Sequence, residues 1–595
     1  MLLRKKVIDF CVLLFLGFSC LTFSILLYAR QIWPDADYEQ ILITLESLSF
    51  DIVKTNTVMS DYFWALLFFI IIFPLCYIFL GTLKRFCVAL ILFLAVLYSS
   101  GYLVYCFYQF STSHLYEEEY KSPREIIYTF PEKKRNLILI YLESFEQNFA
   151  QAQYYEKNLI PNLDNLHNEG AYSSAHYQLP GTGFSIASLV ASQCGIPLRH
   201  LSTRDIYATK YFLPQAVCFP EILKENGYQT AIVKASDIHF TNVDTFAYSH
   251  GYDEALGKEQ ILKHYPVSQH QSLLGGFDGV SDETLFSFAK KKLAMFTPDK
   301  PFMLTLFTLD THTPVEHFST KCPRYFNDIR DAFICTDNTV ANFIDWLKTS
   351  PYWKNTTVVI MGDHLLPVQL KPHRDLHRGI YNVFLNLPDD AKINPSKIFS
   401  TFDMAPSILE SLGITLSERS FGLGHSLFSD TPTLLEKLGF TKLKMQLLAN
   451  SKIYNKFNML PMKRIDKYTN YQLGEIINNN NIAKFTDASE NFLGIYYIDR
   501  LNLKFSSNVD KPLIVKIRFS ALADTQHKIL ITANQHKVFT FVPKKNETAP
   551  YDISFEIEPE MLVAGKLQLK FRNTYGVSTA LQMGIAPLEI TITEK

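Results

Sequence analysis

The chain has 595 residues, of which 48% are hydrophobic and 19% are charged. Its 57 basic residues are balanced by 58 acidic residues, so the composition does not indicate the cationic surface that binds nucleic acid. The charged fraction lies below the ~25% that is usual for soluble domains, which disfavours a disordered or wholly cytosolic protein and indicates that part of the chain lies in lipid.

Three uncharged, apolar segments occupy the N-terminal part, at residues 10–29, 62–83 and 86–110. Each has the ~20 residues that a helix needs to cross the hydrocarbon core of a bilayer. A cleaved signal peptide is the alternative for the first segment, but the segment is long and lacks a small-residue cleavage site. We predict a membrane region of three helices over residues 1–110, followed by a linker over 111–135.

The basic residues that flank these segments predict their orientation. Three of them precede the first segment, and Lys84 and Arg85 fill the turn between the second and third, whereas the loop after the first segment is mainly acidic. Because cytoplasmic loops are enriched in Lys and Arg, the N-terminus is expected in the cytoplasm. An odd number of spans then places the chain after about residue 110 on the outer side of the membrane.

The exported part has four cysteines, and five more lie in the apolar segments. An even number in an oxidising compartment permits two disulfides, and proximity in the sequence favours the pairs Cys194–Cys218 and Cys322–Cys335. Buried free thiols are the alternative.

Between residues 136 and 430, short apolar runs alternate with amphipathic helical stretches. The candidate strands are 136–142, 230–235, 301–309, 356–362 and 381–387. The candidate helices are 220–227, 281–296 and 336–350. Near-continuous apolar strands separated by helices predict an α/β domain with a mostly parallel sheet that is covered on both faces.

The pattern changes after an Asn-rich stretch at residues 478–481. Short strands with alternating polarity follow, at 513–521, 528–534, 537–543, 566–571 and 588–593. We predict a connecting region over 431–490 and a small all-β, sandwich-like domain over 491–595. A carbohydrate-binding role and a packing or spacer role for this domain are equally compatible with the sequence.

Acidic and imidazole side chains follow three of the candidate strands. Glu143 follows the first, Asp310 and His312 follow the third, and Asp363 and His364 follow the fourth. Ligands of α/β sheets bind at the carboxyl ends of strands, and carboxylate oxygens with neutral imidazole nitrogens suit a divalent cation. Taken singly, each residue has an ordinary alternative as a solvated or capping side chain.

A nucleophile candidate comes from the segment LPGTGFSIASLVASQCGIP. A glycine-rich turn containing Gly181 and Gly183 leads into Ser185 at the expected start of a helix. There the serine oxygen lies near unpaired N–H groups and the positive end of the helix dipole, and a bound metal would activate the hydroxyl. The alternative is an ordinary N-cap serine.

Five segments resemble, in the same order, the alkaline phosphatase/sulfatase superfamily: NLILIYLES, PGTGFSIASLVASQCGIP, FTLDTHTP, VVIMGDH and FDMAPSILESLG. More narrowly, the chain is similar to the membrane-bound phosphoglycerol transferases of periplasmic glucans. Lipoteichoic acid synthase and the phosphoethanolamine transferases of lipid A are similar in plan. The resemblance covers roughly residues 136–430, where it implies a sulfatase-like catalytic domain.

The resemblance also implies roles for individual residues. Glu143, Asp363 and His364 match metal ligands, and Ser185 matches the nucleophile that also contacts the metal. His312 matches a histidine that binds the transferred phosphate or protonates the leaving group. The resemblance thus implies one divalent metal ion, and the donor set suits Mn, Mg or Zn.

Two features beyond these matches bear on the site. These transferases usually have threonine where this chain has Ser185, and serine retains the hydroxyl. Thr182 lies three residues before the matching position. His373 and His377 follow the Asp-His pair in the segment LKPHRDLHRG; we take His377 as a candidate substrate-binding residue, with a surface-loop histidine as the alternative.

By resemblance, we expect transfer of a phosphoglycerol headgroup from phosphatidylglycerol to a periplasmic or envelope glycan through a phospho-serine intermediate. The expected location is the bacterial inner membrane, with the catalytic domain in the periplasm and no nucleic-acid partner. The nearest alternative is phosphoethanolamine transfer to lipopolysaccharide sugars. A sulfatase or phosphatase is disfavoured because the segment after Ser185 lacks the Pro and Arg of the sulfatase pattern. A catalytically inactive scaffold that binds polysaccharide is the alternative from another class.

Overall fold

The computed structural model describes part of the chain in detail. The described residues are 2–32, 71, 73–76, 79–99, 111–199, 212–313, 322–367, 370, 378–389 and 391–457, with short stretches between 470 and 594. Two compact units are distinguished, one comprising residues 1–203 and 217–451 and the other residues 204–216 and 452–595.

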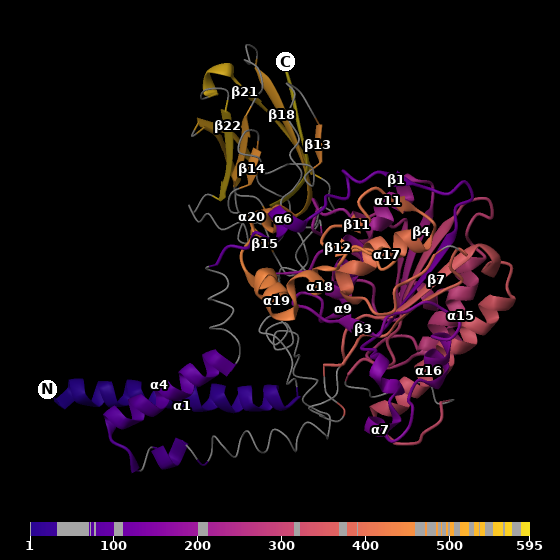
Figure 1. The fold of residues 1–595 in the computed structure, drawn as a ribbon. Helices are drawn as coiled ribbons and strands as arrows, with labels where there is room; N and C mark the ends of the chain where they lie inside the picture. The colour runs from indigo at the N-terminus through magenta and orange to yellow at the C-terminus, as the bar shows by residue number, and fades with distance from the viewer. Residues whose placement is uncertain are drawn as a thin grey trace. The chain divides into compact units, whose positions relative to one another are not determined.

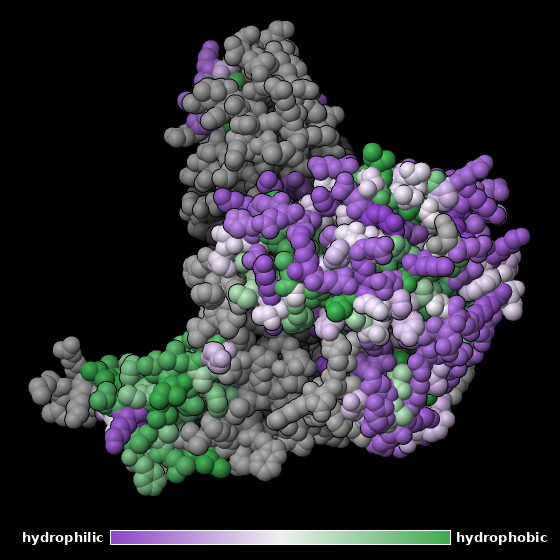
Figure 2. Space-filling view, viewed as in Figure 1, coloured by the Kyte–Doolittle hydropathy of each residue, from purple (hydrophilic) through white to green (hydrophobic). Residues whose placement is uncertain are grey.

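Two long apolar helices, α1 (Leu2–Ile32) and α4 (Thr82–Ser99), pack side by side in the N-terminal part (Figure 1). Their outer faces are hydrophobic (Figure 2), with Phe10 62% and Ile91 66% exposed. Within the described residues, one stretch, Val7–Ser24, is long and apolar enough to cross a membrane.

The other two predicted membrane helices are tested only in part. Most of segment 62–83 and residues 100–110 lie outside the described residues, so the number of spans stays a prediction. The predicted turn at Lys84 and Arg85 is wrong, because both residues lie in the first turns of α4. Lys and Arg have high helix propensity, and the helix therefore begins ahead of them.

A six-stranded sheet forms the centre of the first unit, with the order β5-β4-β6-β2-β7-β8. The strands are β2 (Asn136–Leu142), β4 (Gln229–Lys234), β5 (Glu254–Leu256), β6 (Phe302–Phe307), β7 (Thr356–Gly362) and β8 (Asn382–Leu385). All neighbours are parallel except β7 and β8, which confirms the predicted mostly parallel sheet. Every residue of β6, β7 and β8 is buried, as expected for strands covered on both faces.

Helices cover both faces of this sheet (Figure 1). One face packs on α15 (Asp282–Leu293) and α16 (Ile329–Thr349), and their apolar residues join alternate residues of β2, β4, β6 and β7 in one core. The other side carries α9 (Ser185–Cys194), α11 (Phe219–Glu225) and α17 (Met404–Ser411). The helix α16 begins before the predicted residue 336, because Asp328 caps it by accepting a hydrogen bond from the Arg330 N–H.

The two predicted disulfides are confirmed. Cys194, the last residue of α9, bonds Cys218, which directly precedes α11. Cys322 bonds Cys335 of α16. Both bonds join segments of the first unit, and the first one holds the end of α9 in place.

The described strands of the second unit form antiparallel sheets. The two larger sheets have the orders β13-β23-β18-β21 and β14-β17-β22-β19-β20, and a smaller one pairs β15 (Ser489–Glu490) with β16 (Tyr496–Tyr497). Their longest members are β18 (Leu513–Leu522), β21 (Tyr551–Ile557), β22 (Lys566–Asn573) and β23 (Ile585–Glu594). The strand β21 was not predicted from the sequence. The sandwich arrangement and the domain boundaries stay predictions.

Candidate active site

The ends of two neighbouring strands bring Glu143, Asp363 and His364 together. The strands β2 and β7 pair in parallel, with Leu142 opposite Gly362, so the residues that follow them lie at the same edge of the sheet. One ligand atom from each of the three side chains lies within 4.8 Å of the others. All three side chains are buried, which is an unusual position for charged groups unless they are paired or bind a metal.

Hydrogen bonds orient the free electron pairs of this cluster toward a common point. The His364 Nδ1 lies 2.9 Å from the Leu365 carbonyl oxygen, so Nδ1–H donates to it and Nε2 is the ring nitrogen that faces the two carboxylates. This Nε2 lies 3.4 Å from Glu143 Oε1 and 3.3 Å from Asp363 Oδ2. Within the described residues, Asp363 Oδ2 is buried without a hydrogen-bond partner, whereas Oδ1 accepts two backbone N–H bonds at 2.7 Å.

Burial and mutual repulsion perturb the protonation of this cluster. Burial, with the nearby Glu143 charge, raises the pKa of Asp363 to about 8. Burial alone would lower the pKa of His364, but the two carboxylates outweigh it and raise that pKa to about 9. Burial likewise opposes ionisation of Glu143, yet its contacts with His364 bring its pKa below the ordinary value. Two carboxylates that hold a proton or an imidazolium between them are suited to exchange that positive charge for a metal ion.

Ser185 lies at the first position of α9 and faces this cluster. Its Oγ donates to Glu143 Oε2 over 3.1 Å. The N-cap residue of α9 is Phe184, so the alternative of an N-cap serine does not hold. Ser185 is half-buried and the other nine residues of the helix are buried, so only its first side chain reaches the surface.

A tight turn sets the direction of α9. Gly181 has a positive φ of 77°, and a Cβ at this position would lie 2.7 Å from the Leu198 carbonyl oxygen, so glycine is required. The Thr182 hydroxyl donates to the Leu179 carbonyl oxygen and does not reach the cluster by any described contact.

His312 and Lys234 extend the cluster. His312 is half-buried, its ring lies 3.9 Å from that of Phe277, and its Nδ1 is buried with no hydrogen-bond partner in the described structure. Burial lowers the pKa of His312, against the pull of Glu143. Lys234, the last residue of β4, is buried and donates to the Phe240 carbonyl oxygen over 3.2 Å. Burial lowers the pKa of Lys234 to about 8, although Glu143 raises it.

The sequence analysis missed Lys234 and two threonines that fix the backbone of Glu143. The Thr308 hydroxyl accepts from the Glu143 N–H over 2.9 Å, and the Thr311 hydroxyl donates to the Glu143 carbonyl oxygen over 2.5 Å. Lys234 is the last residue of the apolar run TAIVK, at the end of a predicted parallel strand. Ligands bind at such strand ends, so this position was the signal that could have identified it.

The remaining predicted residues lie elsewhere. Asp310 turns away from the cluster, because its Oδ2 accepts from the Asp282 N–H over 3.0 Å. His373 and His377 lie outside the described residues. The structure thus brings together Glu143, Ser185, Asp363, His364 and His312, and their assignment as ligands and catalytic groups is taken up below.

Comparison with known proteins places this site in context. Residues 135–414 match the model of the sulfatase family. The phosphoglycerol transferase I of Salmonella paratyphi B is 33% identical over 320 residues, which cover 52% of this chain and 41% of that protein. The corresponding protein of Salmonella arizonae has the same identity and coverage. The chain thus spans about two-fifths of the length of these curated relatives.

Solved structures that are similar to part of this chain include the following three. A protein of the alkaline phosphatase superfamily from Vibrio parahaemolyticus is 25% identical, with a TM-score of 0.39, covering 48% of this chain and 67% of that one. The lipoteichoic acid synthase LtaP from Listeria monocytogenes is 21% identical, with a TM-score of 0.39, covering 50% and 74%. The zinc complex of the periplasmic domain of EptC from Escherichia coli is 14% identical, with a TM-score of 0.35, covering 52% and 90%.

Proposed function

We propose that the chain is a metal-dependent transferase of phosphoglycerol headgroups, and the match of residues 135–414 to the sulfatase family model supports this proposal. The donor in this proposal is phosphatidylglycerol and the acceptor is a hydroxyl of a periplasmic or envelope glycan. The observation that carries the proposal is the Ser185 hydroxyl, which lies at the N-terminus of α9 and donates to the Glu143 carboxylate.

The donor set of the site fits a divalent cation. Glu143, Asp363, His364 and Ser185 would hold the ion, and Asp363 Oδ2 is a buried oxygen with no hydrogen-bond donor among the described residues. When bound, such an ion supplies positive charge that lowers the pKa of the serine hydroxyl and offsets the charge on phosphoryl oxygens. The identity of the ion is left open among Mn, Mg and Zn, which all accept oxygen and imidazole ligands.

In the first half-reaction, Ser185 Oγ attacks the phosphorus of the lipid headgroup. The Oγ–P bond forms, the bond from phosphorus to the diacylglycerol oxygen breaks, and Glu143 Oε2 is placed to take the serine proton. The N–H groups at the start of α9 and the Lys234 ammonium, buried beside the cluster, stabilise the phosphate anion. The anionic phosphodiester favours the imidazolium form of His312, which then protonates the leaving alcohol.

The second half-reaction returns the enzyme to its starting state. The neutral His312 takes the proton of a glycan hydroxyl, and that oxygen attacks the phosphorus of the phosphorylated Ser185. The new O–P bond forms, the Oγ–P bond breaks, and the serine recovers its proton from Glu143. A neutral His312 in the unliganded site is consistent with the lowered pKa that burial gives it.

The N-terminal apolar helix places the enzyme beside its donor. A helix that spans the bilayer at Val7–Ser24 keeps the chain at the surface where the phospholipid lies, so the effective donor concentration is high. In this proposal the membrane is the bacterial inner membrane and the catalytic domain lies on its periplasmic side, as the basic residues before the first apolar segment and an odd number of spans together predict.

The proposal is tested by the mass of the Ser185 peptide after the full-length protein is incubated with phosphatidylglycerol. We expect a glycerophosphate adduct on the wild-type peptide and none on Ser185→Ala, which also loses headgroup transfer. Ser188→Ala is the matched control, because Ser188 lies on the same helix and is buried without a described contact to Glu143.

An adduct that persists in Ser185→Ala, or wild-type transfer by that variant, would refute the assignment of the nucleophile. A parallel incubation with phosphatidylethanolamine distinguishes the two headgroups, since an ethanolamine-phosphate adduct has a different mass. Fold alone does not settle this choice.

A further inference from the structure

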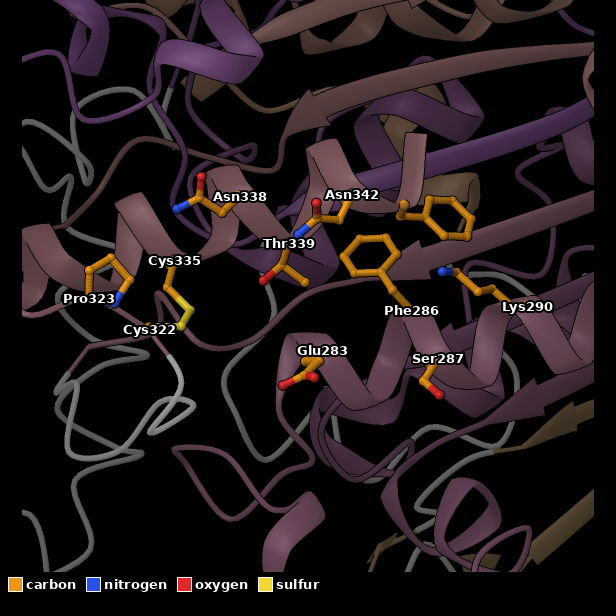
Figure 3. Close-up of a pocket in the computed structure, with 11 residues that line it drawn as sticks. Glu283, Phe286, Ser287, Lys290, Cys322, Pro323, Cys335, Asn338, Thr339 and Asn342 are labelled. Atoms are coloured by element: carbon orange, nitrogen blue, oxygen red, sulfur yellow. A yellow bond between two sulfur atoms is a disulfide. The ribbon is translucent and has the colours of Figure 1, made fainter. Parts of the chain in front are cut away.

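A groove of about 520 Å³ lies between α15 and α16 (Figure 3). The side chains that line it come from both helices and from the segment before α16: Glu283, Phe286, Ser287, Lys290, Cys322, Pro323, Cys335, Asn338, Thr339, Asn342 and Phe343. We propose that this groove binds the glycan acceptor. The inference rests on the proposed function, which it extends by naming where the acceptor chain lies.

The groove is a preformed part of the fold. Phe286 and Phe343 are buried in the main core, with ring centres 4.9 Å apart, and they join the two helices beneath the polar side chains. The Cys322–Cys335 disulfide closes one end (Figure 3). At the other end, the Lys290 Nζ lies 4.9 Å from the centre of the Trp346 ring. A preformed groove between packed helices needs little rearrangement of the protein when a ligand binds.

The lining selects for a neutral ligand that is rich in hydroxyl groups. Asn342 offers a carboxamide and Thr339 a hydroxyl, each of which can both donate and accept hydrogen bonds. The oxygens of Asn338 and Ser287 already accept from Asn162 and Tyr265, and both side chains keep N–H or O–H groups that can donate to a ligand. One acidic and one basic residue leave the lining without net charge, so it does not favour an anionic headgroup. An acyl chain would leave the polar groups without hydrogen-bond partners. Sugar residues are uncharged and carry hydroxyl groups that can hydrogen-bond to the lining, so they fit this groove.

Hydrogen bonds connect the groove to the loop that carries His312. Asp282, which directly precedes Glu283, accepts from the Leu309 N–H over 2.7 Å and from the Thr336 hydroxyl over 2.8 Å. Asp282 also donates its own N–H to Asp310, two residues before His312. The start of α15, α16 and the His312 loop therefore form one hydrogen-bonded unit. The Glu283 end of the groove therefore lies beside the residues that follow β6, which lead to His312.

A glycan longer than one sugar residue can thus be held in the groove while another residue of the same chain reaches the phosphorylated serine. The groove would supply most of the acceptor affinity, and the reacting hydroxyl would be positioned by the rest of the chain.

The test fills the groove with a bulky side chain. In Asn342→Trp, an indole replaces a lining carboxamide on α16, and in Ser287→Trp an indole replaces a lining hydroxyl on α15. The probe is a soluble neutral β-glucan oligosaccharide, and the full-length protein is used in phosphatidylglycerol vesicles. We expect each variant to raise the KM for the oligosaccharide about tenfold. The control Asp345→Trp changes an exposed residue of α16 that does not line the groove, and its KM should equal that of the wild type.

Direct binding of the same oligosaccharide in detergent without lipid separates this inference from the proposed function. The affinity should fall about tenfold in Asn342→Trp and Ser287→Trp, and stay unchanged in Asp345→Trp. Wild-type affinity in both groove variants, with unaltered thermal unfolding, would overturn the inference even if transfer is observed. Binding that is lost in both variants supports the groove even if the wild type transfers a different headgroup.

Discussion

Two clusters of buried acidic side chains lie at the same edge of the main sheet, and they differ in what their oxygens contact. Glu143 and Asp363 lie beside an imidazole and a serine hydroxyl, and Asp363 Oδ2 has no hydrogen-bond donor in the described structure. Asp282, in contrast, uses both carboxylate oxygens, which accept from backbone N–H groups and from the Thr336 hydroxyl.

The difference teaches how to distinguish a structural carboxylate from a ligand. Backbone donors saturate Asp282 and fix a loop to a helix, so its interactions are complete within the chain. In the cluster around Glu143, Asp363 Oδ2 has no hydrogen-bond donor among the described residues, and a cation at this point would satisfy it. Removing a side chain from the first cluster should therefore affect chemistry, and removing one from the second should affect stability.

The largest effect is expected for Asp363→Asn. The loss of one anionic ligand should reduce headgroup transfer by about a thousandfold, because both the metal and its charge stabilisation are weakened. Metal analysis of the purified protein should find about one divalent ion per wild-type chain and markedly less in the variant. If the variant retains both transfer and metal, Asp363 is not a ligand. Asp345→Asn, at an exposed position of α16, serves as the control.

A smaller effect, on stability rather than chemistry, is expected for Asp282→Asn. Burial raises the pKa of Asp282 to about 6. Between about pH 4 and pH 6 the folded protein holds a proton that the unfolded chain has released, so this group stabilises the fold at low pH and loses that contribution as the pH rises. Asparagine does not titrate. As the pH rises through this window, the free energy of unfolding of the wild type should therefore fall by about 2 kcal/mol relative to that of the variant.

This pH dependence is measured by urea unfolding of the solubilised full-length protein at pH 4 and pH 7. A free-energy difference between wild type and Asp282→Asn that stays constant with pH would mean that Asp282 is ionised throughout, and the contrast between the two clusters would lose its electrostatic basis.

The smallest effect is expected for Thr336→Val, which keeps the shape of the side chain and removes one donor to Asp282 Oδ2. We expect a loss of about 1 kcal/mol in the free energy of unfolding, since one buried hydrogen bond to a charged group is removed. Headgroup transfer should be nearly unchanged. Thr349→Val, at the exposed end of the same helix, is the matched control, and equal stabilities of the two variants would contradict the prediction.

The sequence predicted five of the six strands of the main sheet, because each of the five is a short run of apolar residues bounded by polar ones. The three-residue strand β5 was not predicted. It also predicted that Glu143, Asp363 and His364 meet, since all three follow parallel strands. It did not distinguish Asp310 from these ligands, although Asp310 also follows a strand. Asp310 differs from the ligand candidates because its Oδ2 accepts from the Asp282 N–H. Asp282 begins α15, and the pattern of strands does not predict where that helix packs.

Lys234 was missed for a related reason. A charged residue at the end of an apolar strand is common and does not by itself indicate a functional site. Lys234 lies near Glu143 because of the position of β4 in the sheet, which the sequence pattern does not show. The start of α4 was misplaced because Lys84 and Arg85 were read as a turn, whereas local helix propensity continues through them. A local sequence pattern does not show that residues far apart in the sequence, such as Lys234 and Glu143, lie close together.

The covalent link at the far end of α9 has a practical consequence for making this protein. The proposed nucleophile, Ser185, is the first residue of α9, and Cys194, the last residue, forms a disulfide with Cys218. The position of the Ser185 hydroxyl therefore depends on a bond that does not form in a reducing compartment. Protein made in a reducing compartment should lack the Cys194–Cys218 bond, and the headgroup transfer that we propose should increase after controlled oxidation.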